Sequence, residues 1–231
     1  MNIHAVICTR SRDDVSETTD KLVRFLCKCK IGVFLVADAK SIFSAYQGAF
    51  EKIDPDPEDI IIFCHDDIEI WDDPRYFVQK LIETTALPET GFVGPAGTTC
   101  LGADAVWWDQ DRWQQGKHRG QVQHLDKKQG KQWTTQYGDA GDVVVLDGLF
   151  LAARAKVVKD IGLEKPEDFV GEWDFYDIHY TSKAFLKGYT NKVILLKVLH
   201  NSLGELVGRE SWHMNRAAFI AKNEFPMEIK P

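Results

Sequence analysis

Long hydrophobic runs are missing from this sequence of 231 residues. No window approaches the roughly 18 to 20 apolar residues that a membrane-spanning helix requires. The apolar stretch near the N-terminus, residues 5–8, is followed at once by polar and charged residues and is too short for the core of a secretory signal. The sequence therefore predicts no transmembrane segment, and we expect a cytoplasmic protein.

A surplus of positive charge and a cysteine framework are also missing. Lys and Arg number 28 against 35 Asp and Glu, which gives a net charge of −7. Nucleic acids and anionic membranes attract proteins with surplus Lys and Arg, so no nucleic-acid partner is expected. The five cysteines are scattered, and their one close pair, Cys27 and Cys29, has no second pair at zinc-site spacing. We expect reduced thiols, as is usual in the cytoplasm.

Buried strands alternate with amphipathic helices in the first part of the sequence. The predicted elements are strands over residues 3–8, 31–36, 60–64 and 91–94 and helices over residues 17–28, 41–53 and 74–84. This order is typical of an α/β fold with a mostly parallel central sheet flanked by helices. Ligands of such sheets bind beyond the carboxyl ends of the strands, where Thr9, Arg10, Asp38 and the segment 65–67 fall.

The alternation breaks over residues 98–141, which are rich in Gly, Gln and Trp and show no clear period. A segment this long without regular structure predicts a functional loop, a lid or a small subdomain. Regular elements return as a strand over 143–152, a helix over 173–187, a strand over 192–199 and a helix over 205–222. Without a repeat or linker, the sequence predicts a single domain, made of a nucleotide-binding half (1–97), the Trp-rich loop (98–141) and an acceptor-binding and catalytic half (142–231).

The stretch IIIFCHDDIEI, residues 60–70, places His65, Asp66 and Asp67 directly after a buried strand. Two adjacent carboxylates repel each other, so we expect a positive group beside them. A divalent cation fits best, and a site with both His and Asp suits Mn²⁺ or Zn²⁺ better than Ca²⁺. The alternative is that the two aspartates only cap the loop before the helix at 74–84.

Segments spread over nearly the whole chain resemble, in order, the family 2-like branch of the GT-A fold nucleotide-sugar glycosyltransferases. The strand that ends in HDD looks like the DxD element of this family. The further matches are SIFSAYQGAF (41–50), VVVLDGLFLAAR (143–154), GEWDFYDIHYTSKAFLKGY (171–189) and VLHNSLG (198–204). The resemblance implies transfer of a sugar from a UDP-sugar to an unknown acceptor hydroxyl, with inversion, and Mn²⁺ or Mg²⁺ as cofactor.

The resemblance also assigns roles around the metal and the acceptor. Asp67 and His200 match the two metal ligands, and the nucleotide phosphates would complete the coordination shell. His65 replaces the first aspartate of the motif, which faces the ribose or donor sugar. Asp177 matches the catalytic base, although Tyr176 stands where the family has Glu. Asp174, three residues earlier, is the second choice for the base, on the expectation that it shares a helix face with Asp177.

The remaining assignments concern the donor and the sugar. The residues expected to contact the nucleotide or donor are Thr9, Arg10, Arg12, Asp38, Tyr46, Gln47, His65, Asp66 and Asp147, with Asp38 accepting from the uracil N–H. Trp107, Trp108 and Gly148 are expected in the acceptor or sugar pocket, unless the tryptophans fill a satellite core. Two other functions stay open: a UDP- and metal-binding module with little transfer activity, and a metal-dependent phosphohydrolase. The phosphohydrolase is the weaker alternative, because the sequence lacks the carboxylate cluster expected of two-metal enzymes.

Overall fold

The first part of the chain alternates strands and helices as the sequence predicts. We describe a computed structural model of residues 1–9, 15–126, 130–201 and 209–230. The elements of this part are β1 (Ile3–Thr9), α1 (Glu17–Lys28), β2 (Gly32–Ala37), α2 (Ile42–Ile53), β3 (Ile60–His65), β4 (Ile68–Ile70), α3 (Pro74–Thr85) and β5 (Thr90–Gly94). The side chains of Ser16, Ser41 and Asp73 accept hydrogen bonds from backbone N–H groups in the first turns of α1, α2 and α3, which explains where these helices begin.

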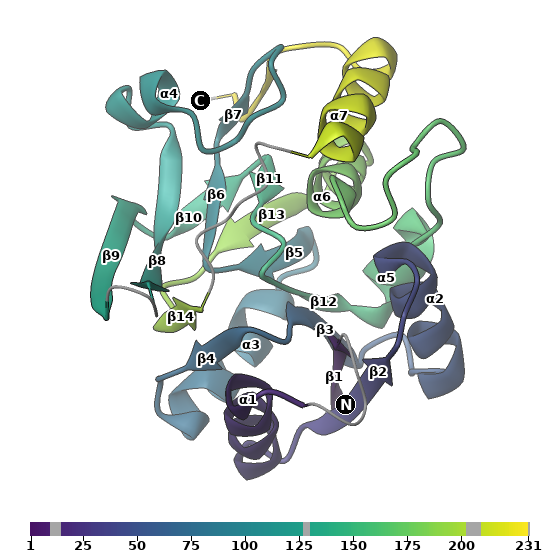
Figure 1. Cartoon of the computed structure of the whole chain (residues 1–231), viewed down its shortest axis with the longest axis vertical. Helices are drawn as coiled ribbons and strands as arrows, with labels where there is room; N and C mark the ends of the chain where they lie inside the picture. The colour runs from purple at the N-terminus through teal and green to yellow at the C-terminus, as the bar shows by residue number, and fades with distance from the viewer. Residues whose placement is uncertain (10–14, 127–129, 202–208, 231) are drawn as a thin grey trace.

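The central sheet has seven strands in the order β10-β13-β5-β12-β3-β1-β2 (Figure 1). Strand β1 pairs in parallel with β2 and β3, and β13 (Thr190–Val193) pairs in parallel with β5. Strand β12 (Phe150–Arg154) lies antiparallel between β3 and β5, so these two run in the same direction. Five of the seven strands therefore share one direction, which confirms the α/β prediction.

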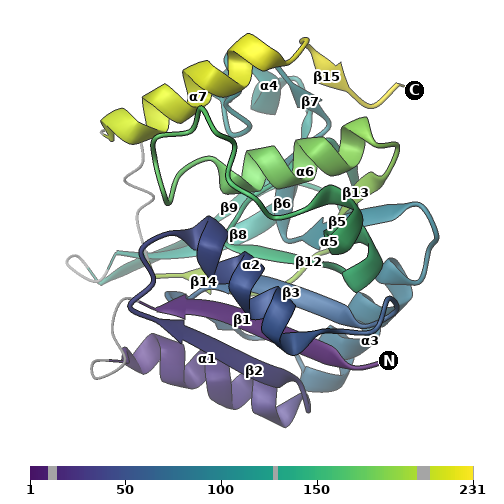
Figure 2. The same ribbon diagram turned by 90° about the vertical axis from the view of Figure 1, so that its right-hand side faces the viewer.

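Helices cover both faces of this sheet (Figure 2). Helices α1 and α3 share one face, where the rings of Phe25 and Phe77 lie 5.3 Å apart. Helix α2 lies on the other face with α5 (Ala155–Ile161) and α6 (Tyr176–Leu186), and its Phe43 packs edge-on against Tyr176. Helix α7 (Glu210–Lys222) packs outside α6. None of the helices in the described part of the chain is long and apolar enough to cross a membrane.

The segment 98–141 is not the irregular loop that its composition predicts. It begins at the last residue of β6 (Ala96–Thr98), contains β7 (Cys100–Leu101), α4 (Gln110–Gln114), β8 (His118–Asp126) and β9 (Lys131–Gly138), and runs into β10 (Gly141–Val143). Strands β8 and β9 pair antiparallel, and β8 belongs to a second sheet in the order β11-β6-β8-β14-β4. Residues along β8 are buried alternately, because one face of the strand is turned toward the protein.

Three further boundaries differ from the sequence prediction. The segment 143–152 is broken by a turn at residues 147–149, which separates β11 (Val145–Leu146) from β12. The segment 192–199 splits between two sheets, because β13 ends at Val193 and β14 (Val198–His200) pairs with β4 and β8. Helix α6 begins at Tyr176 rather than at residue 173, because Phe175 has a left-handed backbone (φ 70°).

The C-terminal end of the described chain packs on two earlier parts of the molecule. Strand β15 (Met227–Glu228) pairs with β7, and the start of helix α7 packs on the segment before α6. The rings of Trp212 and Phe219 lie 5.6 Å and 5.5 Å from that of Phe175. The predicted helix over 205–222 is confirmed from Glu210 onward, and residues 202–208 lie outside the described residues. All five cysteines are free, as expected.

Candidate active site

The His-Asp-Asp turn joins the two sheets. Strand β3 ends at His65 in the central sheet, and β4 begins at Ile68 in the second sheet, so Asp66 and Asp67 form the connection. Two contacts fix this turn: Thr19 Oγ1 donates to the Asp66 carbonyl oxygen at 2.8 Å, and the His65 N–H donates to the Leu149 carbonyl at 3.1 Å. The turn is therefore held by α1 on one side and by the chain entering β12 on the other.

Strand β14 brings His200 to the same place from the far end of the sequence. His200 pairs with Ile68 across β4, and the Asn201 N–H donates to the Asp67 carbonyl oxygen at 2.8 Å. On its other side His200 pairs with His124 of β8. The prediction that Asp67 and His200 lie together is thus supported by the strand pairing itself.

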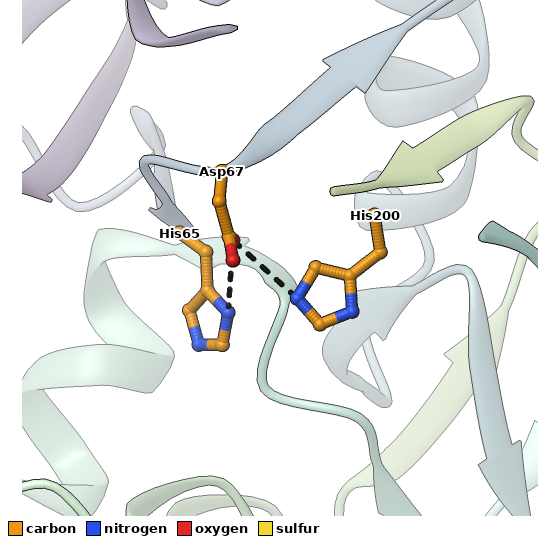
Figure 3. Close-up of side chains that lie close together, drawn as sticks. All are labelled: His65, Asp67 and His200. Carbon is orange, nitrogen blue, oxygen red and sulfur yellow. Dashed lines mark ion pairs between the residues drawn. The ribbon is translucent and has the colours of Figure 1, made fainter. Parts of the chain in front are cut away.

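Three side chains in this corner form a cluster of metal-ligand type (Figure 3). His65 Nδ1 lies 3.7 Å and His200 Nε2 lies 3.4 Å from Asp67 Oδ1. One ligand atom from each residue lies within 4.8 Å of the other two. Asp67 Oδ1 is buried and has no hydrogen-bond partner among the described residues. A buried carboxylate oxygen facing two imidazole nitrogens fits a divalent cation of the Mn²⁺ or Zn²⁺ type.

The ionisation of the cluster agrees with this donor set. Burial acts to raise the pKa of Asp67, but its contact with His200 and the nearby imidazoles lower it to about 2. Burial lowers the pKa of His65 and outweighs the attraction of Asp67. Burial acts to lower the pKa of His200, but the contact with Asp67 outweighs burial and raises this pKa above its usual value. An ionised carboxylate next to a neutral His65 is the form that binds a metal.

The turn at residues 147–149 connects this cluster to helix α6. The Gly148 N–H donates to Asp177 Oδ2 at 3.0 Å, and the Gly148 carbonyl accepts from Tyr176 Oη at 2.8 Å. A Cβ at position 148 would lie 2.4 Å from Tyr176 Oη and 2.8 Å from Asp177 Cβ. Gly148 is therefore required for the turn to approach the start of α6, and it contacts the predicted base rather than lining an open pocket.

Asp177 has the properties expected of a general base. Burial raises its pKa from 3.8 to about 7, with a further contribution from the negative charge of Asp147, against the hydrogen bond from Gly148. A carboxyl group with a pKa near neutrality exchanges protons readily at physiological pH. Asp147 also acts on the pKa values of His65 and His200, so its carboxylate lies among these groups.

The second choice for the base, Asp174, is not placed for that role. It precedes α6, because the helix begins at Tyr176, so Asp174 and Asp177 do not share a helix face as predicted. Asp174 is 3% exposed and accepts from Ser211 Oγ at 2.6 Å and from Arg209 at 3.4 Å. Its carboxylate ties the segment before α6 to the start of α7.

The predicted donor residues outside the turns described above lie in different environments. Thr9 and Asp38 lie at the same sheet edge as His65, because Cys8 pairs with His65 and Thr9 pairs with Ala37. Tyr46 is fully buried with its ring 4.7 Å from that of Phe63, so its expected contact with the donor is wrong for this structure. Gln47 is half-buried and donates to Glu51. Arg10 and Arg12 lie outside the described residues.

The tryptophans divide between core and surface. Trp107 is 2% exposed and packs against His118 and Tyr137, so it belongs to the hydrophobic core rather than to an open sugar pocket. Trp108 is half-buried against Trp212. Trp133, which the sequence patterns do not single out, is 37% exposed and stacks on His124 with the ring centroids 5.3 Å apart.

The stacked pair of Trp133 and His124 adjoins the metal-ligand cluster. The ring of His124 lies 6.4 Å from the ring of His200. No hydrophobic period in the sequence marks these positions, because Gly, Gln and His fill most of this strand. The pairing of β8 with β9 brings Trp133 opposite His124. This places an exposed aromatic ring at the side of the candidate site.

Comparison with protein families identifies the class. The model of the family described as "Glycosyltransferase like family" matches residues 7–219, most of the chain. The chain therefore belongs to this glycosyltransferase-like family, and the resemblance drawn from the sequence is confirmed at that level. No curated protein matches the chain.

Solved structures with a similar fold are distant in sequence. The structure of S. aureus TarS 1-349 is 12% identical with a TM-score of 0.54 and covers 96% of this chain and 64% of its own. The longer S. aureus TarS structure has the same identity and TM-score, with 39% of its own chain covered. A197 from STIV is 13% identical with a TM-score of 0.49, covering 87% of this chain and 86% of its own. The likeness to TarS supports the GT-A fold alone, and this chain spans less than two thirds of either TarS chain.

Proposed function

We propose that this glycosyltransferase moves a sugar from a UDP-sugar to an acceptor hydroxyl, with inversion and with a divalent metal, Mn²⁺ or Mg²⁺, as cofactor. One observation carries the proposal: the metal-ligand cluster and the proton-binding carboxyl of Asp177 are joined through a single turn. His65 bonds to Tyr176, Tyr176 and Asp177 both bond to Gly148, and Asp67 completes the cluster. A group that withdraws charge and a group that takes a proton are what glycosyl transfer requires.

The roles of the residues follow from their surroundings. The pKa of Asp177 is about 7, so its ionised carboxylate is present at neutral pH and can take the proton of an acceptor hydroxyl as that oxygen attacks the anomeric carbon. Asp67 and His200 would hold the metal, which, when bound, would neutralise the charge that develops on the leaving diphosphate. Asp147 adds negative charge beside both groups and would help to attract the cation.

The donor and acceptor sides are assigned by position. Thr9, Asp38 and Asp66 surround the sheet edge where the nucleotide of a UDP-sugar would lie, and Asp38 is exposed and free to accept from a uracil N–H. Trp133, rather than Trp107, supplies an exposed aromatic face for a sugar ring. A cytoplasmic location remains a prediction from the cysteine usage.

Donor hydrolysis and transfer assays with a panel of UDP-sugars and Mn²⁺ test the proposal. Asp67→Ala should weaken UDP binding and abolish turnover, because it removes a metal ligand. Asp177→Asn should leave UDP affinity nearly unchanged and lower turnover by about 10²–10⁴-fold, the usual loss with a general base. Metal-dependent UDP binding without any turnover would favour a binding module instead, and UDP affinity that survives EDTA unchanged would refute the metal role.

A further inference from the structure

His65 and Tyr176 are the two positions at which the sequence departs from the pattern that the resemblance implies, and the structure places them in contact. His65 Nε2 lies 2.7 Å from Tyr176 Oη. The same hydroxyl donates to the Gly148 carbonyl at 2.8 Å. Both contacts are of normal hydrogen-bond length. The two replacements therefore work as a pair rather than as separate losses.

This pair determines which nitrogen of His65 carries the proton. A phenol has one proton, and a carbonyl oxygen can only accept, so the Tyr176 proton points to Gly148. Toward His65 the hydroxyl must then accept, which requires a hydrogen on Nε2. A neutral His65 is left with an unprotonated Nδ1 that can bind a metal.

The free Nδ1 is directed at the other two ligands of the cluster. It lies 3.7 Å from Asp67 Oδ1, an oxygen that already faces His200 Nε2 at 3.4 Å. Two electron-rich atoms at this distance gain nothing from each other directly. Ligand atoms held about 2.1 Å from one metal ion lie about 3.0–3.5 Å apart, so these spacings need only a small adjustment around a cation.

We infer that Tyr176 is a positioning residue that makes His65 a third protein ligand, so that the site binds a transition metal before any nucleotide arrives. The inference rests on the proposed metal dependence of this same site. Two imidazoles and one carboxylate favour Mn²⁺, Co²⁺ or Zn²⁺ over Mg²⁺, which prefers oxygen ligands and retains its water. It replaces the expectation that Asp67 and His200 alone hold the metal together with the nucleotide phosphates.

The test measures Mn²⁺ binding to the chelator-treated protein without nucleotide, by electron paramagnetic resonance of free Mn²⁺. Wild type should bind one ion, and Tyr176→Phe should bind it about 10–100-fold more weakly, the usual effect of removing the partner of a metal-ligating histidine. Tyr180→Phe is the matched control. Tyr180 is also fully buried on α6, and its hydroxyl donates to the Leu163 carbonyl at 2.7 Å, away from the cluster.

A second measurement separates positioning from a merely structural role. Nitrogen-15 NMR of the histidine rings should show His65 protonated on Nε2 in wild type and in Tyr180→Phe, and a mixture of tautomers in Tyr176→Phe. Addition of Zn²⁺ should shift the Nδ1 resonance of wild-type His65. Equal Mn²⁺ affinity in wild type and Tyr176→Phe, or a His65 ring protonated on Nδ1, would overturn the inference.

The outcomes also distinguish this inference from the proposed function. If wild type binds Mn²⁺ only together with UDP, the third ligand is refuted while metal-dependent transfer stands. If Mn²⁺ binds without UDP and no UDP-sugar binds or turns over, the three-ligand site stands and the proposed donor is refuted.

Discussion

The Asp177→Asn variant should become more stable than wild type as the pH rises. The reason is that the wild-type carboxyl is buried in surroundings that favour its protonated form, so wild type loses stability on ionisation. Burial and the charge of Asp147 raise its pKa from 3.8 to about 7. Between these two values the unfolded chain has lost the proton and the folded chain keeps it. The free energy of unfolding of wild type therefore falls by about 1.4 kcal/mol per pH unit, or about 4 kcal/mol in all, and this contribution is constant above pH 7.

The Asn variant lacks this titration. Its amide oxygen can still accept the hydrogen bond from the Gly148 N–H, so the contact that places the side chain is kept. The free energy of unfolding of the variant minus that of wild type should be near zero at about pH 4 and should approach 4 kcal/mol, as an upper bound, at about pH 8. The same variant should lose turnover, so stability and activity should change in opposite directions.

Urea denaturation of both proteins in EDTA, at several pH values from about 4 to 8, measures this difference. Subtracting the wild-type curve removes the contribution of every other titrating group that the two proteins share. A difference that stays constant across the pH range would refute the argument, because it would mean that Asp177 ionises in the folded protein as it does in the unfolded chain.

Three further predictions concern the surroundings of the site. Gly148→Ala should destabilise the protein by about 1–3 kcal/mol and lower turnover, because its Cβ would meet Tyr176 Oη at 2.4 Å; an unchanged melting temperature would contradict this. Trp133→Ala should raise the KM for the acceptor by a few-fold to about tenfold, whereas Trp71→Ala, which alters an exposed tryptophan just beyond β4, should not; equal effects would exclude a sugar platform. Limited proteolysis between residues 98 and 141 should slow in the presence of UDP and Mn²⁺, and equal rates with and without them would count against a lid.

The first three strands and helices could be predicted from the sequence because local signals agree there. The first five residues of strand β3 are apolar and all buried, and α1 begins after a capping serine and carries its apolar residues on one face. Each of these elements is specified by its own residues, with little dependence on a distant partner. The position of the strand ends, and hence of His65 and Asp67, followed from the same signals.

The hairpin of β8 and β9 could not be predicted in the same way. Its residues are rich in Gly, Gln and His, which do not give a hydrophobic period, and β8 is completed by β6 and β14 from distant parts of the chain. The strand state of such residues depends on tertiary pairing rather than on propensity. For this reason Trp133 and His124 were not singled out. Trp107, which precedes the hairpin, was assigned to the acceptor or sugar pocket, with a core position as the alternative.

The site was predictable in part. The resemblance indicated Asp67 and His200, and the pairing of β14 with β4 supports that assignment. The contact between His65 and Tyr176 could not be read from the sequence, because it depends on the turn at 147–149 lying between β3 and α6. Asp174 was misplaced because the left-handed backbone of Phe175 has no sequence signal, glycine being the residue usual in that conformation.

The left-handed backbone of Phe175 also means that helix α7 supports one side of the candidate active site. A non-glycine residue in this conformation costs about 1–3 kcal/mol and persists where the surrounding structure holds it. Here the rings of Trp212 and Phe219 hold Phe175, and the next two residues are Tyr176 and Asp177. Loosening α7 is therefore expected to let residue 175 relax and to rotate the start of α6. A helix that contributes no side chain to the metal-ligand cluster or the base would then influence how the two are placed relative to each other.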